Sequence, residues 1–187
     1  MPIRVIGGSA RGRKLKLVPG DTTRPVMDRV KEALFNIISG DILDSTFLDL
    51  FAGTGSIGIE ALSRGARMVH FVESSKAAAE LIAANLKSLG ITRGFQIIRV
   101  GVGKALRQLE EAGSVADFVF LDPPYSMQEE YAKTLAALAE SKLLRERTLV
   151  IAEHEKRFDP GEAFAELGRY RKLVQGDTAL SFYRRRV

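Results

Sequence analysis

The sequence predicts an α/β fold in which helices cover both faces of a mostly parallel sheet. It also predicts an antiparallel hairpin at the C-terminus and a small basic extension at the N-terminus. From Thr46 onward, short apolar runs alternate with segments whose apolar residues recur at helical spacing. Near the end of the chain, Gly176-Asp177 joins two strand-like runs, which indicates a hairpin. The 187 residues are enough for one domain of this kind with a substantial core.

The first forty residues predict an arm that precedes the sheet. Two short strands are expected in residues 2–18 around a glycine-rich turn, and an irregular linker is expected over 18–25. A helix is expected from about Asp28, because the apolar residues that follow repeat at helical spacing. An apolar stripe must pack against something, so we expect residues 1–40 to form an arm docked on a domain of residues 41–187.

Within that domain, the order of elements follows from the alternation of apolar runs and breaks. The expected strands are 46–51, 67–72, 95–100, 116–121, 148–152, 165–174 and 178–185, and the expected helices are 57–63, 75–89, 103–111 and 131–140.

Composition excludes several classes of site. The chain has no cysteine, which excludes disulfides, zinc–thiolate centres and cysteine nucleophiles. It shows no signal peptide, no apolar run long enough to cross a bilayer and no cluster that suggests a metal. The sequence therefore predicts a cytoplasmic protein that needs no metal, and a monomer is expected.

Positive charge is concentrated in the arm. The chain carries a net charge of +5, and residues 1–31 hold eight of its Lys or Arg residues but only two acidic ones. Local basic patches are typical of polyanion binding, because each neutralised phosphate releases a counterion. The alternative is a basic surface that only favours solubility. The residues predicted to contact RNA are Arg4, Arg11, Arg13, Lys14, Arg24 and Arg29.

A glycine loop after the first expected strand predicts a cofactor site. The loop Gly53-x-Gly55-x-x-Gly58 follows a strand and opens a helix, so its backbone approaches a ligand closely and offers N–H groups at the helix start. Glu73 ends the second strand and is placed to accept ribose hydroxyls. This spacing alone fits an NAD-dependent oxidoreductase. Asp49, however, is suited to the ammonium group of a methionine moiety and would repel a pyrophosphate.

A second loop predicts the chemistry. The buried run 118–121 leads directly into Asp122-Pro123-Pro124-Tyr125, at the sheet edge where open α/β folds place their sites. The prolines stiffen the loop and remove N–H donors, so the loop presents acceptors. Asp122 and the carbonyl of Pro123 are suited to accept both hydrogens of an exocyclic amine, which localises the nitrogen lone pair for methyl transfer. Tyr125 would stack on a base that has left its stack.

At this point the sequence resembles the RsmD family, bacterial guanine-N2 methyltransferases of 16S ribosomal RNA. The resemblance covers nearly the whole chain. Besides the two loops, it rests on Arg4-Val5-Ile6-Gly7-Gly8, Arg11-Gly12-Arg13-Lys14-Leu15, Thr23-Arg24-Pro25 and the stretch 28–36.

The resemblance implies a Rossmann-like class I methyltransferase that uses S-adenosylmethionine and acts on an assembled or nearly assembled small ribosomal subunit. It implies catalytic residues Asp122, Pro123 and Tyr125 and cofactor-binding residues Asp49, Phe51, Gly53, Gly55 and Glu73. Where many relatives place an acid after the third strand, this chain has none in residues 100–104, so we expect backbone groups and apolar contacts to hold the cofactor's adenine.

Three other functions remain open on the sequence. They are adenine-N6 methylation of DNA or RNA, an NAD-dependent oxidoreductase and a non-catalytic RNA-binding factor. The oxidoreductase gives no use to Asp122-Pro123-Pro124-Tyr125, and the non-catalytic factor gives none to Asp49 and Glu73. His70 is expected to be a core or edge histidine, and His154 is expected to lie in a loop past the fifth strand of the sheet.

Overall fold

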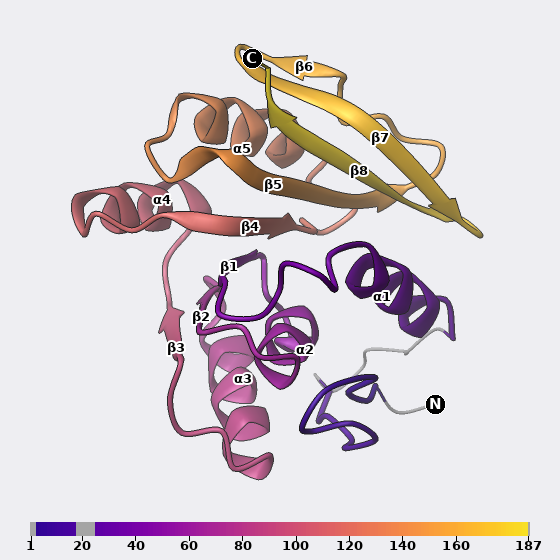
Figure 1. Cartoon of the computed structure of the whole chain (residues 1–187), viewed down its shortest axis with the longest axis vertical. Coiled ribbons are helices and arrows are strands. Elements are labelled where there is room, and N and C mark those ends of the chain that lie inside the picture. Colours follow the sequence, from indigo (N-terminus) through magenta and orange to yellow (C-terminus); the bar gives the residue numbers. More distant parts are fainter. Residues whose placement is uncertain (1–2, 18–24, 187) are drawn as a thin grey trace.

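A computed structural model describes residues 3–17 and 25–186. Its centre is an eight-stranded sheet in the order β3-β2-β1-β4-β5-β8-β7-β6 (Figure 1). The first five strands of that order are parallel, and β8, β7 and β6 extend the sheet in antiparallel fashion. The α/β fold and the C-terminal hairpin predicted from the sequence are confirmed.

The elements alternate along the chain as the periodicity predicts. The strands are β1 Thr46–Leu50, β2 Met68–Val72, β3 Phe95–Ile98, β4 Ala116–Leu121, β5 Leu144–Glu155, β6 Ala163–Phe164, β7 Leu167–Gln175 and β8 Thr178–Arg185. The helices are α1 Pro25–Ile37, α2 Ser56–Ser63, α3 Lys76–Ser88, α4 Val102–Glu111 and α5 Glu129–Glu140.

Two apolar layers enclose the sheet. On one face, α1, α2 and α3 pack with the N-terminal segment, and on the other face lie α4 and α5 (Figure 1). Successive residues of a strand point to opposite faces, so Phe118 and Phe120 join the first layer while Val119 and Leu121 join the second. This double burial explains why β4 reads as an unbroken apolar run rather than as an alternating strand.

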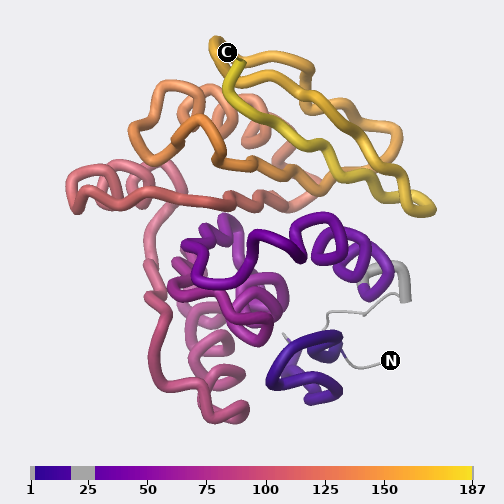
Figure 2. The backbone as a smooth tube through the Cα atoms, in the orientation of Figure 1, coloured from indigo at the N-terminus to yellow at the C-terminus, as the bar shows by residue number. Residues whose placement is uncertain are grey.

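The N-terminal segment folds back beside α2 and α3, as the tube in Figure 2 shows. The two strands predicted within residues 2–18 are reduced to a single bridge between Arg4 and Lys14, so that prediction is wrong in extent. Backbone bonds from Val5 to Arg13 and from Leu15 to Ile3 continue the hairpin on either side of this bridge. Four apolar side chains of the segment enter the first core layer, and they are Ile3, Val5, Ala10 and Leu15.

Three boundaries differ from the sequence prediction by about three residues or more. Helix α1 begins at Pro25 rather than near Asp28, because proline is well tolerated in the first turn of a helix. Strand β5 is longer at both ends than the predicted 148–152, and β6 was not predicted. The rest of the predicted linker, including Arg24, lies outside the described residues.

Candidate functional site

The loop between β1 and α2 makes the tight turn that its glycines predict. Phe51, Gly53 and Gly55 all have positive φ, at 62°, 54° and 76°. Two bonds brace the turn, from the Ala52 N–H to the carbonyl of Val72 at 3.0 Å and from the Gly55 N–H to that of Ala52 at 2.7 Å. The loop therefore lies at the carboxyl ends of β1 and β2, with the first turn of α2 behind it.

Gly58, the third glycine of the motif, sets how closely α2 approaches the sheet. A Cβ at this position would collide with the ring of Phe71 and lie 2.8 Å from a methyl of Val69, both on β2. The absence of a side chain lets the helix pack directly on β2, and this packing places the helix N-terminus against the loop.

Asp49 is a buried carboxylate at the base of this loop. It is 2% exposed, and its Oδ2 accepts the Gly58 N–H at 2.9 Å. Burial raises the pKa of Asp49 well above its usual value, and the nearby charges of Asp122 and Glu73 raise it further. Such a group gains a strong partner when a cation is placed beside it.

Glu73 ties the two ends of the loop together. Its Oε2 accepts the Gly53 N–H at 2.9 Å, and its Oε1 accepts the Ser75 N–H at 2.8 Å, just before α3. A carboxylate has about four acceptor positions, so both oxygens retain capacity for ligand hydroxyls. The residue therefore has a structural role that the sequence did not predict, in addition to the role proposed for it.

The Asp122-Pro-Pro-Tyr loop lies beside the glycine loop because β1 and β4 are adjacent parallel strands. Leu50 pairs with Leu121, so the segments that follow these two residues emerge together at one edge of the sheet. Asp122 is partly buried and Pro123 is buried, whereas Tyr125 is 51% exposed. Burial raises the pKa of Asp122 to about 7. An acceptor and an aromatic ring are thus presented at the rim next to the glycine loop.

The structure adds Glu153, which the sequence did not predict as a site residue. On β5, Ala152 pairs with Leu121, so the next residues along the two parallel strands, Glu153 and Asp122, lie side by side. Burial raises the pKa of Glu153 well above its usual value, and the charge of Asp122 adds to the rise. The signal available in the sequence was the first acidic residue after the buried run 148–152.

An aromatic cluster of Tyr131, His154 and Phe158 packs beside the Glu153 backbone. The Tyr131 hydroxyl donates to the Glu153 carbonyl at 2.6 Å, and the Tyr131 ring lies edge-on to His154 and tilted against Phe158. His154 is fully buried in β5, with Nε2 2.9 Å from the Ser181 hydroxyl. The predicted loop position of His154 is therefore wrong, because backbone pairing with β8 carries β5 on to Glu155. His70 is buried in β2, as expected, and its Nδ1 lies 3.1 Å from the Gln96 side-chain oxygen.

The arm's basic residues lie in different environments. Arg11, Lys14 and Arg29 are exposed. Arg4 pairs with Asp28 of α1 at 3.6 Å, and Arg13 donates to the Ser88 carbonyl of α3 at 2.7 Å. The structure therefore uses one predicted RNA contact, Arg13, to hold the arm on the domain. Arg24 lies outside the described residues.

A buried ionic cluster joins the arm to the helix behind the glycine loop. Glu60 of α2 is fully buried and accepts the N–H groups of Ile6 and Gly7 at 2.8 and 2.7 Å. Its carboxylate also pairs with Arg64 at 2.8 Å and with Lys31 of α1 at 3.6 Å. Burial lowers the pKa of Lys31, and the charge of Glu60 opposes that effect.

The same cluster reaches the glycine loop itself. The Lys31 ammonium donates to the Arg4 carbonyl at 2.6 Å and to the hydroxyl of Ser56, the first residue of α2, at 3.1 Å. Asn85 of α3 makes a second link, since its amide donates to the carbonyls of Lys16 and Thr54, both at 3.1 Å. Arm and glycine loop are thus held by shared side chains.

Two classes of feature are absent from the described part of the chain. Residues 3–17 and 25–186 contain no helix long and apolar enough to cross a membrane. Over the same residues, no group of three or more histidine or acidic side chains is arranged to hold a metal ion.

Comparison with known proteins identifies the family. The model of the family described as conserved hypothetical protein 95 matches residues 3–184. Ribosomal RNA small subunit methyltransferase D of Escherichia coli is 35% identical over 98% of this chain and 90% of its own, and a candidate rRNA methyltransferase of Bacillus subtilis is 39% identical over 98% and 100%.

Solved structures agree with this result. A candidate methyltransferase of Escherichia coli superposes with a TM-score of 0.84 at 30% identity, covering 99% of this chain and 98% of its own. A candidate methylase of Haemophilus influenzae gives 0.80 at 32% identity, covering 99% of each. The chain belongs to the conserved hypothetical protein 95 family, which is the RsmD family of ribosomal RNA methyltransferases.

Proposed function

We propose that this protein transfers a methyl group from S-adenosylmethionine to the exocyclic N2 amine of a specific guanine in 16S ribosomal RNA. The observation that carries the proposal is the position of Asp122-Pro-Pro-Tyr125 at the carboxyl end of β4, directly beside the glycine loop of β1. One loop suits a sulfonium cofactor and the other suits an amine acceptor, so the reacting atoms would meet at one sheet edge.

The residues around the glycine loop fit S-adenosylmethionine. Asp49 is a carboxylate whose pKa is raised by burial, and the ammonium group of the cofactor would offset the cost of ionising it there. Glu73 would accept the ribose hydroxyls, and Phe51, Gly53 and Gly55 would line the cofactor. Gly101 and Val102 at the start of α4 are suited to the adenine by backbone and apolar contact. When bound, the cofactor supplies an electrophilic methyl group on sulfur.

The Asp122 loop would activate and orient the amine. The lone pair of a guanine N2 is delocalised into the ring, which makes it a poor nucleophile. Acceptance of its two hydrogens by Asp122 and by the Pro123 carbonyl would localise that lone pair. Tyr125 would stack on the flipped base, a contact worth about 1–3 kcal/mol. Most of the rate enhancement would then come from positioning and fixed dipoles.

The arm would hold the RNA. We propose that residues 1–40 act as the RNA-contacting arm and residues 41–187 as the catalytic domain, with Arg4, Arg11, Lys14 and Arg29 at phosphates. Arg13 and Arg24 belong to the same proposed set. The substrate would be 16S RNA in an assembled or nearly assembled small subunit in the cytoplasm. The enzyme would act as a monomer and without a metal.

The test is methyl transfer from labelled S-adenosylmethionine to small subunits from cells that lack this protein, followed by nucleoside analysis. Label in N2-methylguanosine is the expected result. Label in N6-methyladenosine would keep the mechanism and overturn the substrate base. No label on subunits or on free ribosomal RNA would overturn the proposal.

A further inference from the structure

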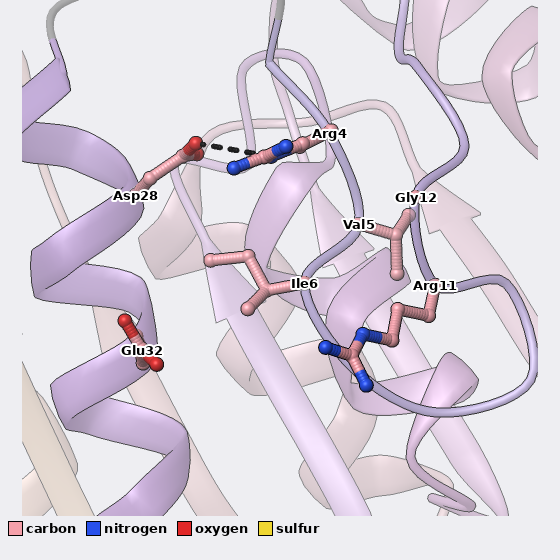
Figure 3. A pocket seen from close by; sticks show the side chains of 7 residues that line it. All are labelled: Arg4, Val5, Ile6, Arg11, Gly12, Asp28 and Glu32. Atoms are coloured by element: carbon pink, nitrogen blue, oxygen red, sulfur yellow. Dashed lines mark ion pairs between the residues drawn. The ribbon is translucent and has the colours of Figure 1, made fainter.

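A cavity lies away from the two loops, within the arm, between the N-terminal segment (residues 3–17) and α1. It has a volume of about 260 Å³, below the range of about 300–1,000 Å³ that is typical of drug-sized ligands. A cavity of this size suits part of a single nucleotide, with the remainder in solvent, better than a whole cofactor. Figure 3 shows its two sides, with Asp28 and Glu32 on α1 facing Arg4, Ile6 and Arg11 on the N-terminal segment.

The charges of this cavity balance, which is unusual for a phosphate site. Two arginines would attract an anion, but two carboxylates on the opposite side would repel a bare phosphate. Arg4 and Asp28 are already paired at 3.6 Å, whereas Arg11 and Glu32 form no ion pair within the described residues. The cavity therefore leaves one cation and one anion available, with the apolar side chain of Ile6 between them (Figure 3).

A nucleotide has the matching chemistry. Its phosphate would meet Arg11, its base would lie against Ile6, and its N–H groups would donate to Glu32, which accepts but does not donate when ionised. Guanine suits one carboxylate best, because N1–H and the N2 amine are adjacent donors on its Watson–Crick edge. Uracil has a single N–H between two carbonyls, and those carbonyls would face the carboxylate. Unpaired bases in RNA loops are commonly recognised along this edge.

The position of the cavity connects it to the active site. The carbonyl of Arg4, which lines the cavity, accepts from Lys31, and Lys31 also donates to Ser56 at the start of α2. In Figure 1 the arm and α1 lie at the end of the sheet to which the arrowheads of β4 and β5 point. An RNA strand that places its target base at Asp122 would therefore pass within reach of this cavity.

We propose that the cavity between the N-terminal segment and α1 is a subsite for a second, unmethylated guanine nucleotide of the RNA substrate, read by Glu32 and held at its phosphate by Arg11. The proposal rests on the function proposed above. It assigns sequence recognition to the arm, whereas general phosphate binding alone would give none. Asp28 acts as a positioning residue that keeps Arg4 at the rim.

The direct test is a titration of the ¹⁵N-labelled protein with guanosine 5′-monophosphate and, separately, uridine 5′-monophosphate, followed by amide chemical shifts. We expect saturable shifts at Ile6 and Gly12, with guanosine monophosphate binding at least about 10-fold more tightly than uridine monophosphate, equivalent to about 1.4 kcal/mol. Glu32→Gln should bring the two nucleotides to similar affinity. Arg11→Ala should weaken both. Asp41→Asn, an exposed acid just after α1, is the matched control and should change neither.

Two results would overturn the proposal. The first is that guanosine and uridine monophosphate bind the unmodified protein with equal affinity. The second is that the changes in amide chemical shift are confined to the glycine loop and the Asp122 loop. A second readout uses small subunits, where Glu32→Gln should raise KM about 5-fold or more with kcat unchanged. Normal methylation with no effect of Glu32→Gln would reject the subsite and keep the enzyme function. Binding of guanosine monophosphate in the cavity without any methylation of small subunits would keep the subsite and reject the proposed enzyme function.

Discussion

At the residue scale, Asp122 is the most informative position to change. Its side chain is the proposed acceptor for the amine, and it lies beside the glycine loop rather than within it. Asp122→Ala should lower kcat by about 100-fold or more, comparable to the loss of one oriented polar group in other active sites. Equilibrium binding of S-adenosylmethionine should remain, measured by calorimetry. A mutant with full turnover would exclude the proposed role of Asp122.

The raised pKa of Asp122, about 7, predicts a pH dependence of catalysis. The acceptor role requires the ionised carboxylate, so kcat/KM should rise with pH through about 7, because this parameter reports the free enzyme. Asp122 and Glu153 lie side by side, so the observed midpoint belongs to the pair. Burial raises the pKa of Asp122, whereas the pKa of Glu153 is raised by burial and by the charge of Asp122, so Glu153 is still protonated when Asp122 ionises. Glu153→Gln should therefore leave the midpoint near pH 7, and a midpoint displaced to lower pH in this variant would show that Glu153 ionises before Asp122.

The same ionisation has a consequence for stability. The folded protein holds the pKa of Asp122 above its unfolded value of 3.8, so protonation of Asp122 favours the folded state. This contribution to the free energy of unfolding is fully present below about pH 4 and is lost as pH rises through about 7. Asp122→Asn should therefore raise Tm at pH 8 more than at pH 4, by about 2–4 °C for each kcal/mol recovered. Thermal unfolding at the two pH values checks this, and equal effects at both would contradict it.

The site residues that the sequence could predict are those in loops marked by glycine or proline. Gly53, Gly55 and the prolines after Asp122 mark loops because their backbone preferences are local. Glu153 lacks such a marker, and only the register between β4 and β5 brings it to Asp122. The hydrogen bonds of Glu73 and Arg13 could not be predicted from the sequence either, because their partners are backbone atoms, which every residue carries.

At the scale of elements, the arm depends on one buried carboxylate. Glu60 accepts from the backbone of the arm and pairs with Lys31 of α1 and with Arg64, just after α2. Glu60→Ala would leave Lys31 buried without its counter-charge, which typically costs about 3–5 kcal/mol. We expect a matching loss in the free energy of unfolding by denaturant. Glu80→Ala is the matched control, because it removes an exposed ion pair with Lys76, and it should change the free energy of unfolding by less than about 1 kcal/mol.

The predicted elements were accurate where a packed face imposes a period, as in α3 and β4. The predicted bounds were inaccurate where a strand is formed by backbone hydrogen bonds and its side chains are not packed against the core. At the start of β5, residues 145–147 are polar and exposed, so no apolar pattern marks them as strand. There the Thr148 hydroxyl accepts from the Arg145 N–H and donates to the Ala116 carbonyl, across the register shift of β4. Such contacts between distant residues leave no local trace in the sequence.

At the scale of the whole molecule, the charge asymmetry between arm and domain predicts how binding responds to salt. Each phosphate neutralised by a side chain contributes about one unit to the slope of log affinity against log salt. Arg11, Lys14 and Arg29 are exposed on the arm, so each alanine substitution should reduce the slope by about one. Filter binding of 16S RNA between low and physiological salt measures this slope.

The anchoring of Arg13 makes this prediction sharper. Because Arg13 donates to the Ser88 carbonyl, Arg13→Ala should weaken RNA binding mainly by loosening the arm, with a loss of Tm and a smaller change in slope than Arg11→Ala. Arg93→Ala, an exposed arginine on the turn before β3, is the control and should leave both quantities unchanged. Equal slope changes for Arg11 and Arg93 would show that the RNA responds to net charge alone. The arm would then lose its assigned role as the part of the molecule that orients the RNA toward Asp122.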